Sequence, residues 1–237
     1  MITFFAEAPS MAGDVTLDDA AAHHASVRRL KVGDEVAMAD GAGLRRIGRI
    51  AALTKKALTV TIEKVEQVPP PPPIHLVVPV ADKDRTLWLA EKATELQVTS
   101  WTPVMYERSK SVTPRGEGEA FDKKIKARMI SALEQSHGAW LPGMCPMSEV
   151  TRLRAADGLP AIVLDRGGAR LGGHRGVVAG MTIAVGPEGG FEPDEIEFLR
   201  STEWSVASLG STTLRFETAA VAALAIARDT LAREHGR

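Results

Sequence analysis

Apolar runs and helix-like periods alternate along the chain from residue 74 onward. Residues 74–80 (IHLVVPV) form a continuous apolar run of the kind expected for a buried strand. A helix is predicted over residues 84–97, because apolar side chains recur on one of its faces. Residues 100–105 (SWTPVM) predict the next strand. Strand, helix and strand in this order indicate a βαβ unit, and therefore an α/β fold with a parallel sheet.

The alternation continues toward the carboxyl end. An amphipathic helix is predicted where apolar residues recur at every fourth position: Phe121, Ile125, Met129 and Leu133. Its other side is basic, which we interpret as a solvated face. The alternative is a contact for RNA, formed together with Arg108, Lys110 and Arg115 just upstream. Residues 161–165 (AIVLD) and 182–186 (TIAVG) supply further core strands.

The first part of the chain has a different pattern. Residues 34–40, 44–53 and 57–68 read as short strands joined by tight turns, the antiparallel pattern of a small β-barrel. Five consecutive prolines follow at residues 69–73 and predict an extended, semi-rigid spacer. We therefore expect a barrel domain over residues 1–68 and an α/β domain over residues 74–237.

Two segments near the carboxyl end, residues 182–199 and 205–227, each read as a strand, a loop of glycine and small polar residues, and a helix. Open α/β sheets bind ligands at the carboxyl ends of their strands. The two loops therefore predict one shared pocket. We call residues 186–190 the GPEGG loop and residues 209–214 the LGSTTL loop.

The composition of the GPEGG loop limits the ligand. Neither the GxxxxGK[ST] nor the GxGxxG spacing is present, and Glu188 would repel a polyphosphate. A neutral or cationic ligand with hydrogen-bonding edges suits the loop better. A tight turn with a surface acid is the alternative for this loop taken alone.

Arg215 and Glu217 come directly before a nearly all-apolar helix, residues 219–227. A helix that is apolar all round is buried on more than one side, so we expect it between the sheet and a second subunit. The two charged residues are expected at its buried entrance. They form either a structural ion pair or a cation and an acceptor aimed into the pocket.

Composition sets weaker limits. The chain has 237 residues and a formal net charge of −1, so contacts to nucleic acid would have to come from local basic patches, such as the one in the amino-terminal part. Its one cysteine, Cys145, rules out an intramolecular disulfide and fits a reducing cytoplasm. The six histidines show no metal-ligand spacing, so no metal is expected. No segment suggests a membrane span.

Several blocks of the chain resemble those of the RsmE-type methyltransferases of the SPOUT class. The resemblance rests on their order and spacing: GPEGG at 186–190, LGSTTLRFETA at 209–219, an H…V.RLKVGD block at 23–34, KATEL at 92–96, ERS at 107–109 and EQS at 134–136. The chain departs from the family pattern at Arg28, at Gln97, where a glycine is usual, and at His137, Gly138 and Trp140.

The resemblance implies a methyltransferase that uses S-adenosylmethionine to modify uridine N3 in 16S ribosomal RNA of the small subunit. It also implies a PUA-like RNA-binding barrel, a carboxy-terminal trefoil knot and a homodimer. Its implied cofactor-binding residues are Gly186, Pro187, Glu188, Gly189, Gly190, Leu209, Gly210, Leu214 and Thr218. The residues expected to carry catalysis are Arg215 and Glu217, where Glu217 either orients Arg215 or takes part in proton removal. The residues expected to contact RNA are His23, Arg28, Arg29, Arg46 and Arg108.

Two alternatives stay open at this point. One is a non-catalytic RNA-binding or ribosome-assembly factor that kept the fold. The other is a SPOUT methyltransferase that acts on another RNA.

Overall fold

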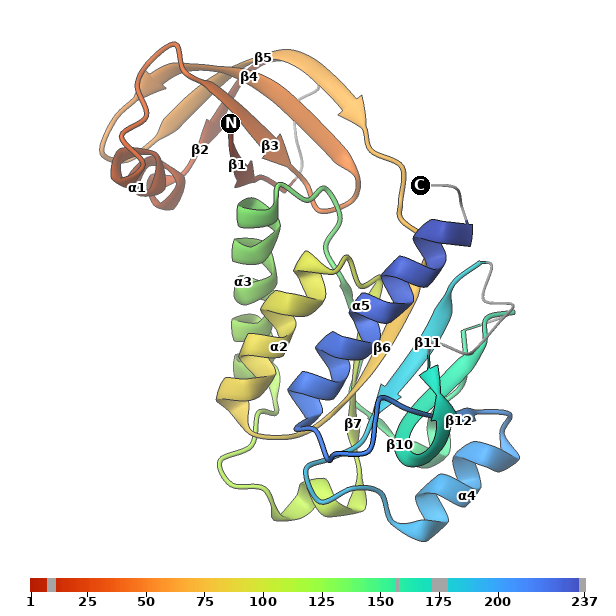
Figure 1. Ribbon diagram of the computed structural model, residues 1–237. Helices are drawn as coiled ribbons and strands as arrows, with labels where there is room; N and C mark the ends of the chain where they lie inside the picture. The colour runs from red at the N-terminus through yellow and green to blue at the C-terminus, as the bar shows by residue number, and fades with distance from the viewer. Residues whose placement is uncertain (8–11, 157, 172–178, 235–237) are drawn as a thin grey trace. The chain divides into compact units, whose positions relative to one another are not determined.

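A computed structural model describes residues 1–7, 12–156, 158–171 and 179–234 (Figure 1). Its contacts divide the chain into two compact units. Unit 1 contains residues 1–70 and 130–141, and unit 2 contains residues 71–129 and 142–237. The predicted boundaries placed residues 130–141 in the second domain, whereas the contacts group them with unit 1.

Unit 1 is a five-stranded sheet with one short helix. The strands are β1 (Ile2–Phe5), β2 (Gly13–Leu17), β3 (Glu35–Ala39), β4 (Leu44–Leu53) and β5 (Leu58–Gln67), and the helix is α1 (Asp19–Val27). The strand order is β1-β3-β4-β5-β2. The three strands predicted from sequence are confirmed, and their mutual pairing is antiparallel as expected. β1, which was not predicted, pairs with β3 in parallel.

Residues 130–141 complete unit 1 through hydrogen bonds. The indole Nε1 of Trp140 donates to the carbonyl of Val68 at 3.1 Å, and the amide of Phe5 donates to Glu134 Oε1 at 2.8 Å. His137 Nδ1 lies 3.0 Å from the hydroxyl of Thr3. His137 and Trp140, two of the departures from the family pattern, thus have structural contacts inside unit 1.

Arg46 does not lie on the surface as expected. It is fully buried, because it pairs across the strands with Met38 and so shares the inward face of β4 with Gly48 and Ile50. Burial lowers the pKa of its guanidinium, an effect that Asp40 partly offsets. A phosphate contact by Arg46 on the outer surface is therefore wrong for the described fold.

Unit 2 is an α/β layer structure. Its strands are β6 (Ile74–Pro79), β7 (Ser100–Met105), β8 (Gly143–Met144), β9 (Ser148–Glu149), β10 (Ala161–Arg170), β11 (Met181–Val185) and β12 (Ser205–Ser208). Its helices are α2 (Lys83–Glu95), η1 (Glu107–Ser111), α3 (Glu119–Ser136), η2 (Val150–Arg152), α4 (Pro193–Ser201) and α5 (Phe216–Glu234), and the last two turns of α3 belong to unit 1. The strands and helices predicted from residue 74 onward are confirmed.

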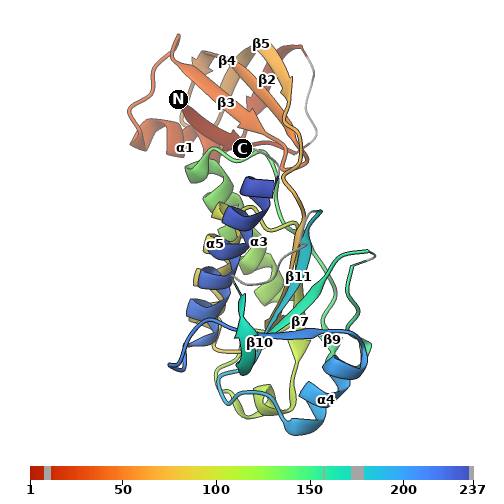
Figure 2. The ribbon, with the colours of Figure 1, turned by 45° about the vertical axis from the view of Figure 1, so that its right-hand side comes forward.

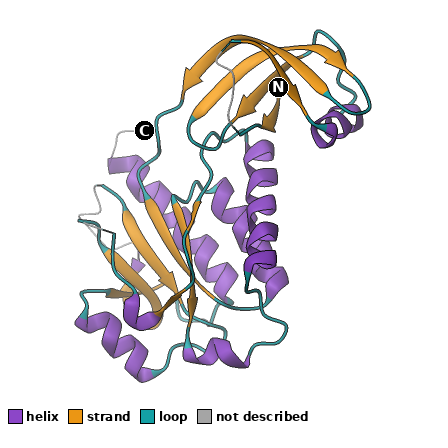
Figure 3. Cartoon of the chain, turned by 180° about the vertical axis from the view of Figure 1, so that it is seen from behind, coloured by secondary structure: helices purple, strands orange, loops and turns teal. Residues whose placement is uncertain are grey.

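Every pairing in the unit 2 sheet is parallel, in the order β12-β10-β11-β6-β7-β8, with β9 beside β7. Helices α2 and α5 lie side by side on one face of this sheet, and α4 lies on the other (Figures 2 and 3). Leu199 of α4 packs there with Val77, Val163 and Ala184 of three neighbouring strands. Coverage of both faces explains why the strands are continuous apolar runs. The trefoil knot stays a prediction.

Arg228 ties α5 to the end of α2. Its Nε donates to the carbonyl of Leu96 at 2.8 Å, and its other nitrogens donate to the carbonyls of Pro72 and Gln97. The carbonyls of Leu96 and Gln97 follow the last turn of α2, where carbonyls lack partners within the helix. Burial lowers the pKa of Arg228 to about 10.

Four helices end in the same way. In each, a residue with a left-handed backbone follows the last turn, and the next amide donates to the carbonyl five residues before it, the Schellman pattern. Among the described residues, the non-glycine residues with positive φ are those at these four ends: Arg29, Gln97, His137 and Glu203. Gln97, at φ 57°, occupies the position where the family usually has glycine, and the backbone there keeps the conformation that glycine favours.

Candidate active site

The GPEGG and LGSTTL loops line one pocket of about 340 Å³. The pocket lies at the carboxyl ends of three adjacent strands, because Leu164 of β10, Val185 of β11 and Ala207 of β12 contribute to its wall. The sequence-based prediction of a shared pocket is thereby confirmed. All predicted cofactor-binding residues except Thr218 line it, and Thr218 is exposed in the first turn of α5.

Packing explains the glycines of the GPEGG loop. A Cβ atom on Gly186 would lie 2.6 Å from the ring of Phe191, and one on Gly189 would lie 2.9 Å from Cδ of Arg108. Gly190 has φ of 76°, a conformation that side chains rarely adopt. The Phe191 ring in turn packs edge-on against the buried Tyr106 ring, with centroids 5.1 Å apart. The loop is therefore closely fitted to its neighbours.

Arg85 holds the acidic residue of this loop. Its Nη1 donates to Glu188 Oε1 at 2.5 Å, and its Nε lies 4.0 Å from Glu217 Oε1. Arg85 comes from the first turn of α2, where Asp82 caps the helix and accepts the backbone amide of Arg85. One guanidinium thus connects the GPEGG loop to the start of α5.

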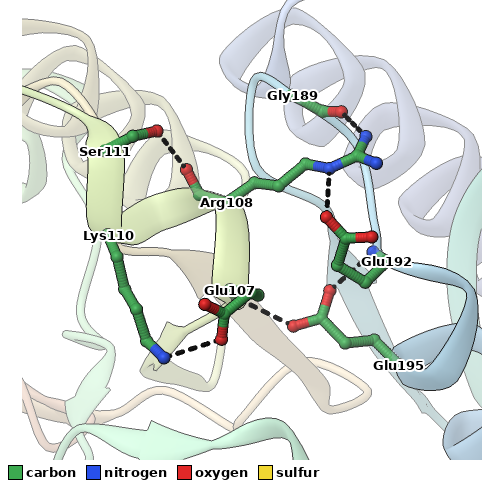
Figure 4. A network of polar contacts seen from close by, with 7 residues as sticks. All are labelled: Glu107, Arg108, Lys110, Ser111, Gly189, Glu192 and Glu195. Carbon is green, nitrogen blue, oxygen red and sulfur yellow. Dashed lines mark hydrogen bonds and ion pairs between the residues drawn. The ribbon is translucent and has the colours of Figure 1, made fainter.

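Arg108 also contacts the loop (Figure 4). Its Nε donates to Glu192 Oε1 at 2.7 Å, and its Nη1 donates to the carbonyl of Gly189. The carboxylate of Glu192 raises the pKa of Arg108 above its usual range. The residue predicted to bind RNA is therefore already paired with protein groups at the pocket.

The LGSTTL loop has few attachments. Leu209 is half-buried, and residues 210–215 are exposed. The Arg215 side chain makes no hydrogen bond or ion pair with any residue in the described ranges. Arg215 and Glu217 were both expected at the buried entrance of α5. Glu217 is buried there as predicted, whereas Arg215 is exposed. The one carboxylate expected to orient Arg215 faces Arg85 instead.

Comparison with known proteins decides the family. A family model described as an RNA methyltransferase domain matches residues 69–228. The chain belongs to this RNA methyltransferase family. A second model, described as an RNA methyltransferase PUA domain, matches residues 17–63 in unit 1. The predicted fold class, a parallel α/β domain with a PUA-like amino-terminal domain, is confirmed.

Named relatives of this family agree along most of the chain. Ribosomal RNA small subunit methyltransferase E of Mycobacterium bovis is 30% identical over 217 residues, which span 85% of this chain and 80% of the relative. The crystal structure of the Neisseria gonorrhoeae protein of the same name, bound to S-adenosyl methionine, superposes with a TM-score of 0.85 at 25% identity and covers 97% of this chain and 98% of that one. A Thermotoga maritima structure described as a predicted RNA methyltransferase gives 0.74 at 31% identity, covering 97% and 99%.

The remaining predicted RNA contacts lie in unit 1 of this methyltransferase. His23, Arg28 and Arg29 are exposed on α1 and at its carboxyl end, and Arg28 Nε donates to His24 Nε2 at 3.5 Å. Arg46 is the exception described above.

Sequence reasoning missed four residues of the methyltransferase pocket and its surroundings: Arg85, Asp165, Arg166 and Phe191. Arg85 precedes the KATEL block, but its partner Glu188 is 103 residues away in sequence, so no local pattern connects them. Asp165 and Arg166 end the apolar run of β10, and strand ends are where the pocket was expected. Their position after an apolar run could therefore have predicted that these two residues lie at the pocket.

Metal and membrane features were also searched for within the described ranges. No group of three or more His, Cys, Asp or Glu side chains there is placed to hold a metal ion. No helix in the same ranges is long and apolar enough to cross a membrane.

Proposed function

We propose that this protein transfers the methyl group of S-adenosylmethionine to N3 of a uridine in small-subunit ribosomal RNA. The observation that supports this most is the pocket shared by the GPEGG and LGSTTL loops, in a chain of the RNA methyltransferase family. The names of its relatives, ribosomal RNA small subunit methyltransferase E, point to the same substrate class.

The residues of the pocket fit this cofactor. Its volume, about 340 Å³, lies in the range of small-molecule sites. Its wall carries the carboxylates of Asp165 and Glu188 and the guanidinium groups of Arg108 and Arg166, and Glu188 is also paired with Arg85. Groups of both signs suit a ligand that has a positively charged sulfur and a zwitterionic amino-acid end. S-adenosylmethionine supplies an electrophilic methyl group on that sulfur. The residues proposed to hold it are Gly186, Pro187, Glu188, Gly189, Gly190, Leu209, Gly210 and Leu214.

Arg215 is proposed to stabilise the charge that develops on the uracil carbonyl oxygens when the N3 proton leaves. A guanidinium stays protonated and offers several donors, and in this chain no side chain of the described residues occupies it. Its exposure beside the pocket suits contact with a base that arrives from outside.

Glu217 is proposed as the second residue of the chemistry. One of its carboxylate oxygens faces Arg85, and the other, Oε2, is buried without a hydrogen-bond partner among the described residues. An unpartnered carboxylate oxygen is free to accept a proton. Oε2 has no exposed surface and Glu217 does not line the pocket, so in this role the side chain turns from Arg85 toward the pocket before Oε2 takes the proton.

RNA is proposed to dock on unit 1 through His23, Arg28 and Arg29. Contacts to phosphate make affinity fall with salt, so reversing Arg28 and Arg29 to Glu should lower both the affinity and its salt slope. We also propose that the enzyme works in the cytoplasm as a homodimer. Part of α5 supports a second subunit, since Val221, Ala222 and Ile226 stay partly exposed on a mostly apolar helix.

Labelled S-adenosylmethionine and unmodified small ribosomal subunits test the proposal. Label should appear in the subunit RNA, and mass spectrometry should place it on N3 of one uridine. Subunits that already carry the modification are the control and should accept no label. RNA binding that ignores S-adenosylmethionine, with no label incorporated, would instead identify a non-catalytic factor. Label found only in transfer RNA would identify a methyltransferase with another substrate.

A further inference from the structure

Arg108 contacts the GPEGG loop in two different ways. Its guanidinium hydrogen-bonds to the carbonyl of Gly189, and its Nε pairs with Glu192 at the residue that caps α4 (Figure 4). Gly189 lies within the loop and Glu192 lies two residues after its last residue, so Arg108 holds the carboxyl end of the loop. Arg108 itself belongs to η1, which follows β7, and β6 separates β7 from β11 in the sheet.

The stem of Arg108 also passes directly beside the loop backbone. A Cβ atom on Gly189 would lie 2.9 Å from Cδ and 3.3 Å from Cβ of Arg108. Cβ atoms essentially never come within 3.0 Å of another heavy atom. A side chain at position 189 would therefore displace the Arg108 stem, so the two residues are packed against each other.

Glu195 joins η1 to the start of α4. Glu195 Oε1 accepts the amide of Glu107 at 2.9 Å, and Glu195 Oε2 accepts the amide of Glu192 at 2.9 Å (Figure 4). Glu195 is buried, so these bonds are shielded from water. The helix end that receives Arg108 is thus fixed to the same 3-10 helix that carries Arg108.

The partners of Arg108 leave it poorly suited to hold a phosphate. Both Nε and Nη1 are already donating to protein oxygens, and the carboxylate of Glu192 balances the charge. A phosphate would have to displace these contacts before it gained the same guanidinium.

We propose that Arg108 is a positioning residue for the cofactor loop of the methyltransferase, and that it sets the affinity for S-adenosylmethionine rather than for RNA. This inference rests on the proposed function, because it takes the GPEGG loop as part of the cofactor pocket. Pre-formed loops bind more tightly because less order is lost on binding. Loss of the Arg108 guanidinium frees Gly189 and lets the loop sample other conformations.

The test uses the full-length protein with Arg108→Met, which keeps the apolar stem and removes the guanidinium. The dissociation constant and KM for S-adenosylmethionine should rise by about three- to tenfold, in the range expected for one half-exposed ion pair with an added hydrogen bond. The kcat at saturating S-adenosylmethionine should stay within about twofold, because the reacting groups are unchanged. RNA affinity and its salt slope should not change. Glu192→Gln should give the same pattern more weakly.

Lys110→Met is the matched control. It removes one positive charge from the same 3-10 helix, but Lys110 pairs with Glu107 and does not touch the loop. Its S-adenosylmethionine affinity should equal that of the wild type. If Arg108→Met lowers the RNA salt slope by about one and leaves the cofactor affinity intact, Arg108 is an RNA ligand and the inference is overturned.

Gly189 offers a second, independent readout. Gly189→Ala should weaken S-adenosylmethionine binding, because the added methyl group displaces the Arg108 stem. In an Arg108→Ala background the same substitution should cost much less, so the two effects should not add. Full additivity would contradict the shared packing. A wild-type protein that fails to bind S-adenosylmethionine would overturn the proposed function as well, whereas wild-type binding with unaffected Arg108 variants overturns this inference alone.

Discussion

The two loops of the pocket differ in how they are held. The GPEGG loop is fixed by Arg85 at Glu188, by Arg108 at Gly189 and by the Phe191 ring at Gly186. The LGSTTL loop is mostly exposed, and its side chains make no hydrogen bonds or ion pairs with the described residues. A methyltransferase has to keep its cofactor in one place and admit a large RNA beside it. A fixed loop suits the first task and a free loop suits the second.

The largest effect is expected on the free loop. Arg215→Ala should slow single-turnover methyl transfer by about 10²- to 10³-fold, the usual loss when one charge-stabilising donor is removed. The affinity for S-adenosylmethionine should change little, because Arg215 does not line the pocket. Rapid-quench assays with pre-bound cofactor measure the rate, and calorimetry measures the affinity. Arg200→Ala, which removes an exposed arginine from α4, is the control and should match the wild type. A wild-type rate in Arg215→Ala would remove this residue from the chemistry.

The next effect is expected on the fixed loop. Gly186→Ala should cost about 1–3 kcal/mol, because its Cβ would overlap the Phe191 ring and overpacked groups must move. If that cost falls on the loop, the affinity for S-adenosylmethionine drops by about 5- to 150-fold. Gly143→Ala is the control, since a Cβ there meets its nearest atom at an ordinary 3.7 Å. Equal affinities in the two variants would show that the loop is less tightly fitted than its contacts indicate.

A smaller effect is expected from Arg85→Met. Removing this partner of Glu188 should weaken S-adenosylmethionine binding by about two- to fivefold, because a partly exposed ion pair contributes little. Arg128→Met is the control in the same unit, where Arg128 lies 3.9 Å from Glu91 away from the pocket. If Arg85→Met lowered kcat more than it lowered the affinity for S-adenosylmethionine, Arg85 would act on the reaction through its contact with Glu217 rather than on the cofactor loop.

The smallest effect is expected from a substitution far from both loops, which should change the stability of the fold and not the binding of the cofactor. Gln97→Gly should raise the free energy of unfolding by about 0.5–1 kcal/mol, since glycine adopts the left-handed backbone at this helix end without strain. Gln135→Gly, in the last turn of α3, should lower it by a similar amount. Urea denaturation measures both. Neither substitution should alter the affinity for S-adenosylmethionine. If Gln97→Gly changed that affinity, the stability of the fold rather than the attachment of the loops would control cofactor binding.

Local patterns were enough to predict most strands and helices and the shared pocket. Apolar runs and periods are properties of neighbouring residues, and the carboxyl ends of parallel strands meet at one edge. For Arg46 the alternation of residues along the strand was informative, but the prediction followed the charge of the side chain instead. Ile50, Gly48 and Arg46 alternate on one face of β4, which places Arg46 inside, but its charge suggested the surface.

Other features have no local signal. Arg85 meets Glu188, and Arg108 meets Glu192, only because the order of the parallel strands brings β6 and β7 loops beside the loop that follows β11. The grouping of residues 130–141 with unit 1 is equally non-local. Trp140 reaches Val68 across 72 positions of sequence, and a proline run between the two units suggested a simple division at that point.

The discontinuity of unit 1 has a consequence for the order in which the chain matures during synthesis. The first 70 residues leave the ribosome without Glu134 and Trp140, so the amide of Phe5 and the carbonyl of Val68 still lack their native partners. Those partners emerge only after β6 and β7 have been made. The amino-terminal unit therefore cannot finish folding ahead of the rest, and the nascent chain closes its first unit only after it has begun its second.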